Sequence, residues 1–508
     1  MKKTICILLI LLFSVTSVFA QKKYAFAISL LPKLSENDQT ITVPHETSCP
    51  LWTDTIVLQP EGYVMDADGD VEISSPEGLV WLISAVNGLN GCEPDDFEGR
   101  TVRLVNDIDF GKELWKKYCF SPVGTRETPF AGTFDGNGHR IHHLWQWYSL
   151  YDSISDYYFD MGLFGYIRHA VVKNVTLDST SVVSSSCNYP DYYRGGMVGF
   201  ADSLSLVENI HIHTNGIGFA YGSSVVGMNR NSTVRNCAFR GPLYYGAPIE
   251  EGAGLVSYNR SEGGYADAVV ENCYYYGRIN AIYGIQYNLA GLVCLNETIP
   301  NGKGKNAIVR NCHSTPTSHF IARHYGSLVA VLSDGSCVRN CYTDLTQMYQ
   351  YAQIIGLNEG GEMLDCSEYT NINGVGTLAV PVTINDTTTD NLLDALNLWI
   401  ANQEHPELYR TWAIVNDSIP VFADYYVGIP ENEASAERVN VHPNPTSGLV
   451  SIEGVAATEV QVYNAMGQLL KTVRSTNEIN LEGLPQGVYT LRIADEKGFV
   501  VVRKVVKE

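Results

Sequence analysis

The feature that most constrains the fold of this chain is a short segment that recurs between residues 172 and 366. Each copy has valine first, asparagine third and an apolar residue or cysteine fourth, and the copies begin at Val172, Val207, Val234, Val270, Val309, Val338 and, in a diverged form, Met363. Successive asparagines lie about 27 to 39 residues apart, a spacing typical of solenoid repeats. The segment therefore predicts a stack of similar layers, one for each repeat, which we call tiers.

A small residue followed by an apolar run precedes every copy, as in Gly162-Leu163-Phe164-Gly165 and Gly254-Leu255-Val256-Ser257. The two halves predict two strands per tier. Hairpins would need turn dipeptides such as Asn-Gly between the halves, and these are mostly absent. We therefore expect like strands to lie in parallel above one another, about 4.8 Å apart.

Parallel stacking brings equal positions of successive repeats together. We expect a ladder of side-chain amides at a bend, formed by Asn174, Asn209, Asn236, Asn272, Asn311 and Asn340. We expect thiols to stack inward as small apolar residues, at Cys237, Cys273, Cys312, Cys341 and Cys366. Asp365 lacks the amide, and Ser224 and Ser327 replace the glycine, so we expect the ladder to end or loosen at those tiers.

Both ends of such a stack need covering, because an open end is an exposed sheet edge. Ser75-Pro76, a helical apolar pattern and then Gly88 predict a short capping helix at the start. Residues 390–402 carry apolar residues at helical spacing, and strand-like segments follow at 411–414 and 421–422. We expect this second helical segment to close the other end.

The first twenty residues have the pattern of a secretory signal: Lys2 and Lys3, an apolar run, and a small residue before Gln21. No later window is apolar enough to span a bilayer. The formal net charge is −21, which makes nucleic acid and anionic lipid poor partners. We therefore expect an exported chain that reaches the outer cell surface or the medium through the periplasm and binds no nucleic acid.

The composition changes near the C-terminus, where residues 429–437 form a polar, acidic linker. Residues 438–508 then alternate like short strands separated by turns, which suggests a small Ig-like sandwich. The positions that characterise this segment are Pro443, Asn444, Pro445, Gly448, Gly467, Gly487, Lys504, Val505 and Val506.

This C-terminal segment closely resembles the sorting domain of the type IX secretion pathway of Gram-negative bacteria. The shared features are the Pro443-Asn444-Pro445 turn, the turn ending at Gly467, the strand entry at Gly487 and the ending Lys504-Val505-Val506. The resemblance implies the type IX machinery and its tail-removing, sortase-like protease as partners. It also implies that the body is often attached to surface lipopolysaccharide.

The repeats look like the GLUG-type repeat of bacterial surface proteins, and residues 130–141 resemble the coil that usually opens such stacks. The likeness covers roughly residues 60 to 425 and implies fold far more than activity. We therefore expect an all-β chain: a right-handed parallel β-helix with helical end caps, followed by the small sandwich.

The expected organisation is a signal peptide (1–20), a strand-rich segment (21–74), the β-helix with its N-terminal capping helix (75–366), a C-terminal cap (367–428), the linker (429–437) and the sorting domain (438–508).

No catalytic or metal-binding constellation emerges from the sequence, and we expect neither a cofactor nor a metal. Some proteins with GLUG repeats are zinc peptidases, but the His-Glu-x-x-His pattern is absent here. Asp66, Asp68 and Asp70 have the wrong spacing for a calcium loop and fit a tight turn better. Outward positions read Lys173, Glu208, Arg235, Glu271, Arg310 and Arg339, which predicts a salt-bridged ridge.

Aromatic residues gather in a loop that interrupts the repeat, beside His139, His142 and His143. Such residues can stack on a sugar or anchor a protein, and the candidates are Trp145, Trp147, Tyr148 and Tyr151. They can equally pack over the flank as a private core of the loop, and this alternative applies also to Tyr192-Tyr193 and Tyr274-Tyr275-Tyr276.

Two functions remain open. The first is a non-enzymatic adhesin or binding scaffold that displays loops to a glycan or protein ligand. The second is a polysaccharide-degrading enzyme, a lyase or glycosidase, which would need paired carboxylates or a base beside a cation on one exposed face.

Overall fold

In this computed structural model the described residues are 50–111, 117–148, 160–178, 181–185, 192–213, 217–219, 222–245, 251–281, 286–300, 304–318, 322–344, 353–369, 377–384, 387–414, 420–423, 440–463, 469–474, 477–495 and 500–508. The predicted signal peptide, residues 21–49 and the predicted linker lie outside them. The chain divides into two units, Met1–Arg410 and Thr411–Glu508.

The first unit is mostly β and contains two large sheets. The repeated segment lies in the larger one, on β9 (Val171–Leu177), β12 (Leu206–His213), β16 (Thr233–Arg235), β21 (Ala268–Glu271), β25 (Ala307–Arg310), β28 (Cys337–Arg339) and β31 (Glu362–Leu364). Each strand pairs in parallel with the next. The expected parallel pairing of the repeats is therefore confirmed.

The register places the first valine of each repeat in one interior column: Val172, Val207, Val234, Val270, Val309, Val338 and Met363. Upstream strands β2 (Val71–Ile73), β3 (Thr101–Leu104) and β5 (Thr133–Asp135) extend this column through Val71, Val102 and Phe134. The valines are fully buried, whereas Met363 is 45% exposed. Among the described strands, none pairs with the far side of β31, which leaves Met363 at the end of the column.

Each repeat contains more strands than the two expected. The asparagine adopts a positive φ, between 48° and 57° in the six copies. From Asn236 onward this left-handed bend separates the repeated strand from a further strand of the same sheet, whereas Asn174 and Asn209 lie within β9 and β12. Asparagine tolerates that conformation better than most residues, because its short polar side chain can bond locally. These later strands are β17 (Ala238–Arg240), β22 (Tyr274–Ala281), β26 (His313–Ser318), β29 (Tyr342–Asp344) and β32 (Ser367–Tyr369).

The rest of the larger sheet consists of shorter strands near its start and edge: β1 (Tyr63–Met65), β4 (Ile108–Asp109), β6 (Arg140–His142), β7 (Trp145–Tyr148), β10 (Val182–Ser185), β13 (Ile217–Phe219) and β18 (Leu243–Tyr245).

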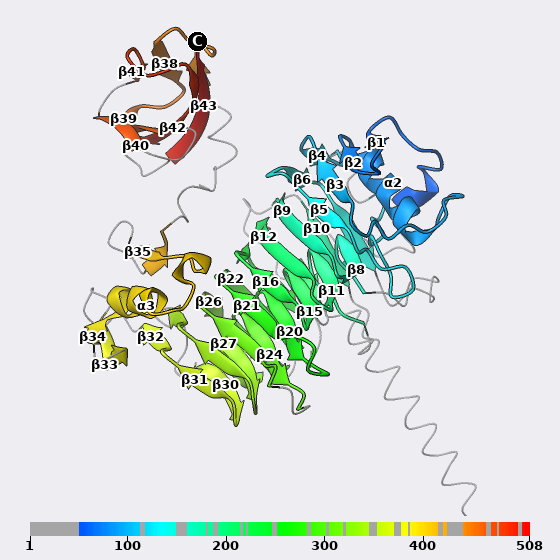
Figure 1. Cartoon of the computed structure of the whole chain (residues 1–508), viewed down its shortest axis with the longest axis vertical. Coiled ribbons are helices and arrows are strands. Elements are labelled where there is room, and N and C mark those ends of the chain that lie inside the picture. Colours follow the sequence, from blue (N-terminus) through cyan, green and yellow to red (C-terminus); the bar gives the residue numbers. More distant parts are fainter. Residues whose placement is uncertain are drawn as a thin grey trace, which may run out of the picture. The chain divides into compact units, whose positions relative to one another are not determined.

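The smaller sheet carries the other half of the repeat. Its strands are β8 (Phe164–Arg168), β11 (Val198–Asp202), β14 (Gly222–Ser223), β15 (Val226–Arg230), β19 (Glu251–Ala253), β20 (Val256–Ser261), β23 (Gln286–Ala290), β24 (Val293–Thr298), β27 (Ala322–Ser333) and β30 (Gln353–Glu359). All of them pair in parallel. The strands β8, β11, β15, β20, β24, β27 and β30 follow one another in sequence order along the unit (Figure 1). One hydrophobic core lies between the two sheets.

The helix predicted after Ser75 is α2 (Pro76–Asn87). The Ser75 hydroxyl accepts a hydrogen bond from the Gly78 N–H, and Gly88 ends the helix at φ +70°. Its buried residues, including Leu79, Leu82 and Ile83, join the same core as the strands. The helix lies beside β1 and β2, at the first tiers of the unit (Figure 1). A short 3-10 turn, η1 (Trp52–Asp54), precedes these elements.

At the other end of the first unit, the hairpin β33 (Thr377–Ile384) and β34 (Thr387–Asn391) leads into α3 (Leu392–Ala401). The Asn391 side chain caps α3, and Leu392, Leu396 and Trp399 are buried. The 3-10 turn η2 (Pro406–Leu408) follows. Contacts described below join Leu396, Leu408 and Arg410 to the asparagines of three tiers, and closure of the end by this segment stays a prediction.

The second unit contains two antiparallel sheets that share one core. One consists of β37 (Asn440–His442), β38 (Leu449–Glu453) and β41 (Glu478–Asn480); the other of β39 (Ala457–Tyr463), β40 (Leu469–Arg474), β42 (Gly487–Asp495) and β43 (Val500–Lys507). Val450 and Ile479 from the first sheet pack with Val460 and Leu491 from the second. A separate hairpin, β35 (Trp412–Ile414) and β36 (Pro420–Phe422), precedes them.

Adjacent tiers approach each other closely at Gly254, so a substitution there tests the stacking. A Cβ there would lie 1.9 Å from the Gly291 carbonyl oxygen and 2.5 Å from the Tyr275 ring. Gly254→Ala should therefore lower the free energy of unfolding by more than about 2 kcal/mol, measured by urea denaturation. Gly91→Ala is the control, because its Cβ would meet nothing within 4 Å while its φ is +82°; it should cost only about 1 kcal/mol of strain. Equal losses in the two variants would contradict the close tier contact.

Candidate functional site

The asparagines of the repeat form a column of hydrogen-bonded amides on one flank of the first unit. Asn209 donates to Asn174 over 2.9 Å, Asn272 to Asn236 over 3.2 Å, and both Asn311 and Asn340 to their predecessors over 2.8 Å. At the start, Asn174 donates to Asp135 over 3.0 Å. The amide of Asn236 instead meets Glu208 at 3.5 Å, so the ladder is interrupted between Asn209 and Asn236.

The tiers that depart from the pattern behave differently from one another. Asp365 keeps the left-handed bend with φ 54°, but in the described part of the chain no side-chain hydrogen bond joins it to Asn340, and the amide ladder ends there. The two serines that replace glycine keep their tiers linked. The Ser224 hydroxyl donates to the Gly254 carbonyl and that of Ser327 to the Gln353 carbonyl. We expected loosening at these serines, and the hydroxyl hydrogen bonds provide a link instead.

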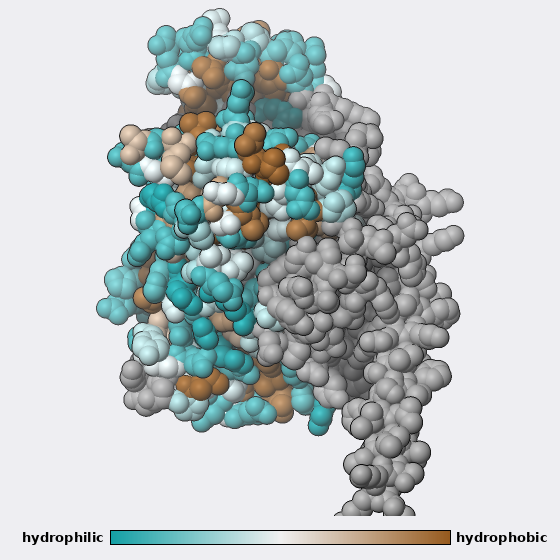
Figure 2. All heavy atoms as spheres, turned by 90° about the vertical axis from the view of Figure 1, so that its right-hand side faces the viewer, coloured by the Kyte–Doolittle hydropathy of each residue, from teal (hydrophilic) through white to brown (hydrophobic). Residues whose placement is uncertain are grey.

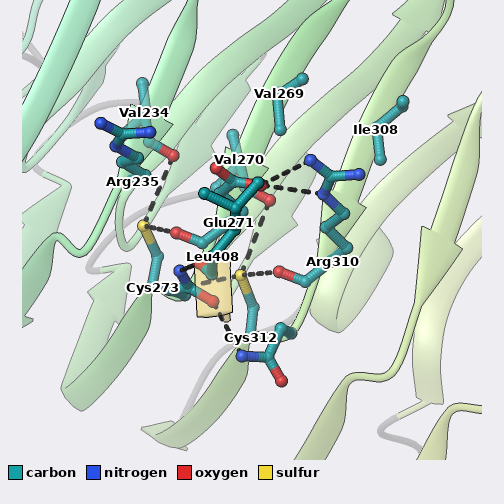
Figure 3. A network of polar contacts seen from close by, with 12 residues as sticks. Val234, Arg235, Val269, Val270, Glu271, Cys273, Ile308, Arg310, Cys312 and Leu408 are labelled. Atoms are coloured by element: carbon teal, nitrogen blue, oxygen red, sulfur yellow. Dashed lines mark hydrogen bonds and ion pairs between the residues drawn. The ribbon is translucent and has the colours of Figure 1, made fainter. Parts of the chain in front are cut away.

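The cysteines that follow the asparagines point into the core. Cys237, Cys273, Cys312 and Cys341 are fully buried, and Cys366 packs against the same core at its edge. Each of the four buried thiols contacts a backbone carbonyl in its own tier and another in the tier before, as Figure 3 shows for Cys273 and Cys312. Burial raises the pKa of the Cys237, Cys312 and Cys341 thiols. All five are free thiols, and they pack as small apolar residues.

Part of the asparagine column is covered by a later stretch of the chain. We call residues 408–410 the strap. The Leu408 carbonyl accepts from Asn272 over 2.9 Å and the Arg410 carbonyl accepts from Asn311 over 2.9 Å. In α3, the Leu396 carbonyl accepts from Asn340 over 3.2 Å. These three asparagines are at most 1% exposed, whereas Asn209 is exposed and Asn174 and Asn236 are half-buried.

The strap region also lies near a stack of rings on the outer face of the larger sheet. His313 stacks between Tyr274 and Tyr342, with ring centroids 5.1 Å and 5.2 Å apart. All three are at most 4% exposed. Burial, together with the positive charges of Arg410 and Arg240, lowers the pKa of His313 to about 3.

A second amide ladder lies inside the smaller sheet, and the sequence analysis missed it. Asn229 donates to Asn259 and Asn259 to Asn296, each over 2.7 Å, and all three side chains are fully buried. Their amides also donate to backbone carbonyls of neighbouring strands. The signal that could have revealed it is an asparagine two residues after Gly227, Ser257 and Cys294 in three successive repeats.

The outward charges of the larger sheet pair between adjacent tiers, as expected for a salt-bridged ridge. The ion pairs are Lys173 with Asp135, Arg235 with Glu208, Arg310 with Glu271 and Arg339 with Glu362. The smaller sheet has a similar set, Arg230 with Asp202 and Arg260 with Glu297, and Arg126 pairs with Asp160 in the loops before it. Hydrophilic side chains cover most of the coloured surface in Figure 2, with hydrophobic ones in small separate patches.

Three histidines of the first tiers each contact an aspartate, and we call these pairs the histidine row. His139 lies 3.0 Å from Asp107 and His143 lies 2.7 Å from Asp109. His142 bonds to Asp178, whose side chain is 2% exposed, and this hydrogen bond raises the pKa of His142. In the next tier, burial and the charge of Arg240 lower the pKa of His213 to about 4.

Of the four candidate ligand-binding aromatics, only Trp145 has a side chain within the described residues. Trp145 is 2% exposed, so its indole packs inside the protein. Trp147 and Tyr148 lie on β7, and their side chains are outside the described residues, as is the whole of Tyr151. Of the other tyrosines, Tyr193 packs edge-on against Phe200 and Tyr258, and Tyr275 lies in the core, while Tyr276 is 57% exposed.

In the second unit, the Pro443-Asn444-Pro445 turn is joined to the last strand. The Asn444 side chain accepts from the Val506 N–H over 2.8 Å, and the Thr446 N–H donates to the Val506 carbonyl over 2.8 Å. Val505 is fully buried. Gly448 approaches Glu482 so closely that a Cβ would lie 2.6 Å from its side chain. Gly487 and Lys504 pair with the neighbouring strand in β42 and β43, and Gly467 lies outside the described residues.

Comparison with known proteins identifies this unit. Residues 440–508 match the family model of the secretion system C-terminal sorting domain, within two residues of the predicted start. The match supports export and anchoring by type IX secretion, to the cell surface or the extracellular space. A search of the curated proteins finds no match to the chain.

Two further findings concern the described residues alone. Within them, no helix has the length and apolar character needed to cross a membrane. The same residues contain no group of three or more histidine, cysteine, aspartate or glutamate side chains arranged to hold a metal ion.

The covered part of the asparagine column should contribute more stability than the exposed part. Asn311→Ala removes buried amide hydrogen bonds and places alanine at φ +50°, so the free energy of unfolding should fall by about 3 to 4 kcal/mol. Asn311→Gly loses the same hydrogen bonds without the strain and should cost about 1 kcal/mol less. The exposed Asn209→Ala should cost about 1 to 2 kcal/mol. Urea denaturation measures all three, and equal losses for Asn311→Ala and Asn209→Ala would contradict the covering role of the strap.

The ring stack should make stability depend on pH. His313 stays neutral in the folded chain down to about pH 3, whereas in the unfolded chain it takes up a proton below about pH 6.5. Its contribution is therefore complete above about pH 6.5 and is lost as the pH falls. Between pH 7 and pH 5, the wild type should lose about 2 kcal/mol more stability than His313→Phe, which keeps the ring. Parallel losses in urea titrations of both proteins would show that His313 is protonated in the fold.

Proposed function

We propose that this chain is an exported cell-surface protein whose first unit is a right-handed parallel β-helix of GLUG-type repeats. In this proposal the unit is a non-enzymatic binding scaffold, an adhesin, that displays loops to a glycan or protein ligand. Its boundaries are those expected from the sequence: a β-helix over 75–366, a cap over 367–428 and a linker over 429–437.

The tail supplies the export part of the proposal. The match of residues 440–508 to a secretion system C-terminal sorting domain supports export through type IX secretion. We propose that a signal peptide over residues 1–20 first takes the chain to the periplasm. A sortase-like protease then removes the tail near the linker, and lipopolysaccharide anchors the body.

The observation that carries the scaffold proposal is the pairing of outward carboxylates with arginines across tiers. Burial alone would raise the pKa of Asp202, but hydrogen bonds from Arg230 and Tyr166 outweigh it and lower that pKa. Asp202, held in this way, is a poor proton donor, and general acid catalysis needs a proton near neutral pH. The paired charges therefore suit a rigid display surface better than a catalytic one.

One observation favours the alternative, a polysaccharide-degrading enzyme. The His142–Asp178 pair combines a histidine of raised pKa with a buried carboxylate. The neighbouring His213 is neutral beside Arg240. A base beside a cation is the arrangement that a lyase requires. The histidine row is therefore where catalysis would be sought.

Surface display and ligand retention can be tested in one experiment. Gram-negative cells with a type IX pathway that make the full chain, and matched cells that make it without residues 440–508, are incubated with labelled glycans and extracellular proteins. Cells with the full chain should retain a ligand and release no product, and cells lacking the sorting domain should retain none. Product release that disappears in His142→Ala would establish the enzyme instead. Equal retention by both strains would refute surface display through the tail.

A further inference from the structure

The site under the strap occurs twice in the first unit. We call Glu271, Asn272, Arg310 and Asn311 the strap site. The same residue types at the same strand positions, two tiers earlier, are Glu208, Asn209, Arg235 and Asn236, which we call the second site. In each site the arginine of one tier bonds to the glutamate of the tier before, over 2.8 Å in the strap site and 2.6 Å in the second site.

The strap shows how a peptide occupies such a site. Carbonyls two residues apart, those of Leu408 and Arg410, accept from the asparagines of two adjacent tiers. The residue between them, Tyr409, places its ring 5.2 Å from the Arg310 guanidinium. Its backbone is extended, with φ −106° and ψ 135°. The recognised pattern is therefore an extended peptide with an aromatic side chain between two exposed carbonyls. Figure 3 shows the ion pair of Glu271 and Arg310 across successive strands, with Leu408 drawn in the same view.

The second site presents the same groups on a more open surface. The Glu208 side chain is 22% exposed against 7% for Glu271, and Arg235 is 33% exposed against 29% for Arg310. Asn209 is exposed, whereas Asn272 is 1% exposed. Within the described residues, no backbone carbonyl accepts a hydrogen bond from the Asn209 or Asn236 amide.

The strap cannot extend to the second site, for a local reason. The 3-10 turn Pro406–Leu408 ends on the first residue of the strap, and in it the Pro406 carbonyl accepts from the Tyr409 N–H over 3.1 Å. That carbonyl is the one that would face the next asparagine of the column. The turn therefore directs the chain away after the strap site, and a second peptide must come from elsewhere.

We propose that the second site binds an extended segment of a partner protein, with an aromatic residue stacked on Arg235 and flanking carbonyls bonded to Asn209 and Asn236. The binding mode resembles other peptide docking in which backbone hydrogen bonds give affinity and one side chain gives specificity. This inference rests on the proposed scaffold function and names the partner class of one surface on it.

The test uses the strap sequence as its probe. A fluorescein-labelled peptide of residues 405–412, His-Pro-Glu-Leu-Tyr-Arg-Thr-Trp, is titrated with the purified full chain, and fluorescence anisotropy reports binding. Binding should be saturable. Arg235→Ala, and separately a peptide with alanine in place of the tyrosine, should each weaken it about tenfold. Arg260→Ala is the matched control, since Arg260 forms an equivalent ion pair with Glu297 on the other sheet, and it should leave binding unchanged.

Other results would overturn the inference in distinguishable ways. Absence of binding, or binding that Arg235→Ala leaves unchanged, would mean that the second site does not take such a peptide. Self-association in sedimentation that Arg235→Ala abolishes would identify the occupant as the strap of a second copy, not a partner. Ligand retention by cells that persists in the Arg235→Ala chain, with no peptide binding, would leave the scaffold function standing while this inference fails.

Discussion

The left-handed bend at one asparagine per tier is the constraint on which the stack depends. From Asn236 onward the chain leaves one strand of the larger sheet here and begins the next, and in all six copies the position needs a residue that tolerates positive φ. Asparagine is favoured over glycine for a second reason. Its amide can donate and accept at once, so each bend is hydrogen-bonded to the bend above or below. The same residue therefore sets both the local turn and the tier spacing.

Burial divides this column into two parts with different properties. In the covered part, the strap and α3 supply carbonyls to amides that are shielded from water, and an unsatisfied donor there would be costly. In the exposed part, water can satisfy the same groups. The ladder interruption, between Asn209 and Asn236, falls within the exposed part, whereas the hydrogen bond from Asn272 to Asn236 joins the two parts. Stability is thus concentrated in the later tiers, and the earlier tiers retain polar groups that can bind other molecules.

Local signals in the sequence predicted much of the fold. The spacing of Val270, Asn272 and Cys273 with their equivalents gave the parallel tiers, because like residues must stack when strands repeat in register. The capping residues Ser75 and Gly88 marked α2, since their roles depend only on neighbours in the chain. The sorting domain followed from motifs within one short segment.

Contacts between segments far apart in the sequence could not be predicted from these local signals. Asn272 bonds to a carbonyl 136 residues later, and no periodicity in the sequence indicates that pairing. The buried ladder through Asn259 was missed because asparagine in a strand is usually a surface residue, and only the register shows that these amides bond one another. For Trp145, the cluster of aromatics left both ligand binding and packing within the loop open, and only the tertiary structure shows that its ring is buried.

Met363 stands in the interior column yet is half exposed, because no described strand pairs beyond β31. Each earlier valine is shielded by the tiers on either side, so its burial depends on those two neighbours and not on the total number of tiers. A tandem duplication of one repeat would therefore lengthen the stack while leaving the packing of existing tiers intact. The length of the stack is therefore a quantity that evolution can adjust in steps of one repeat, separately from the chemistry of any single surface.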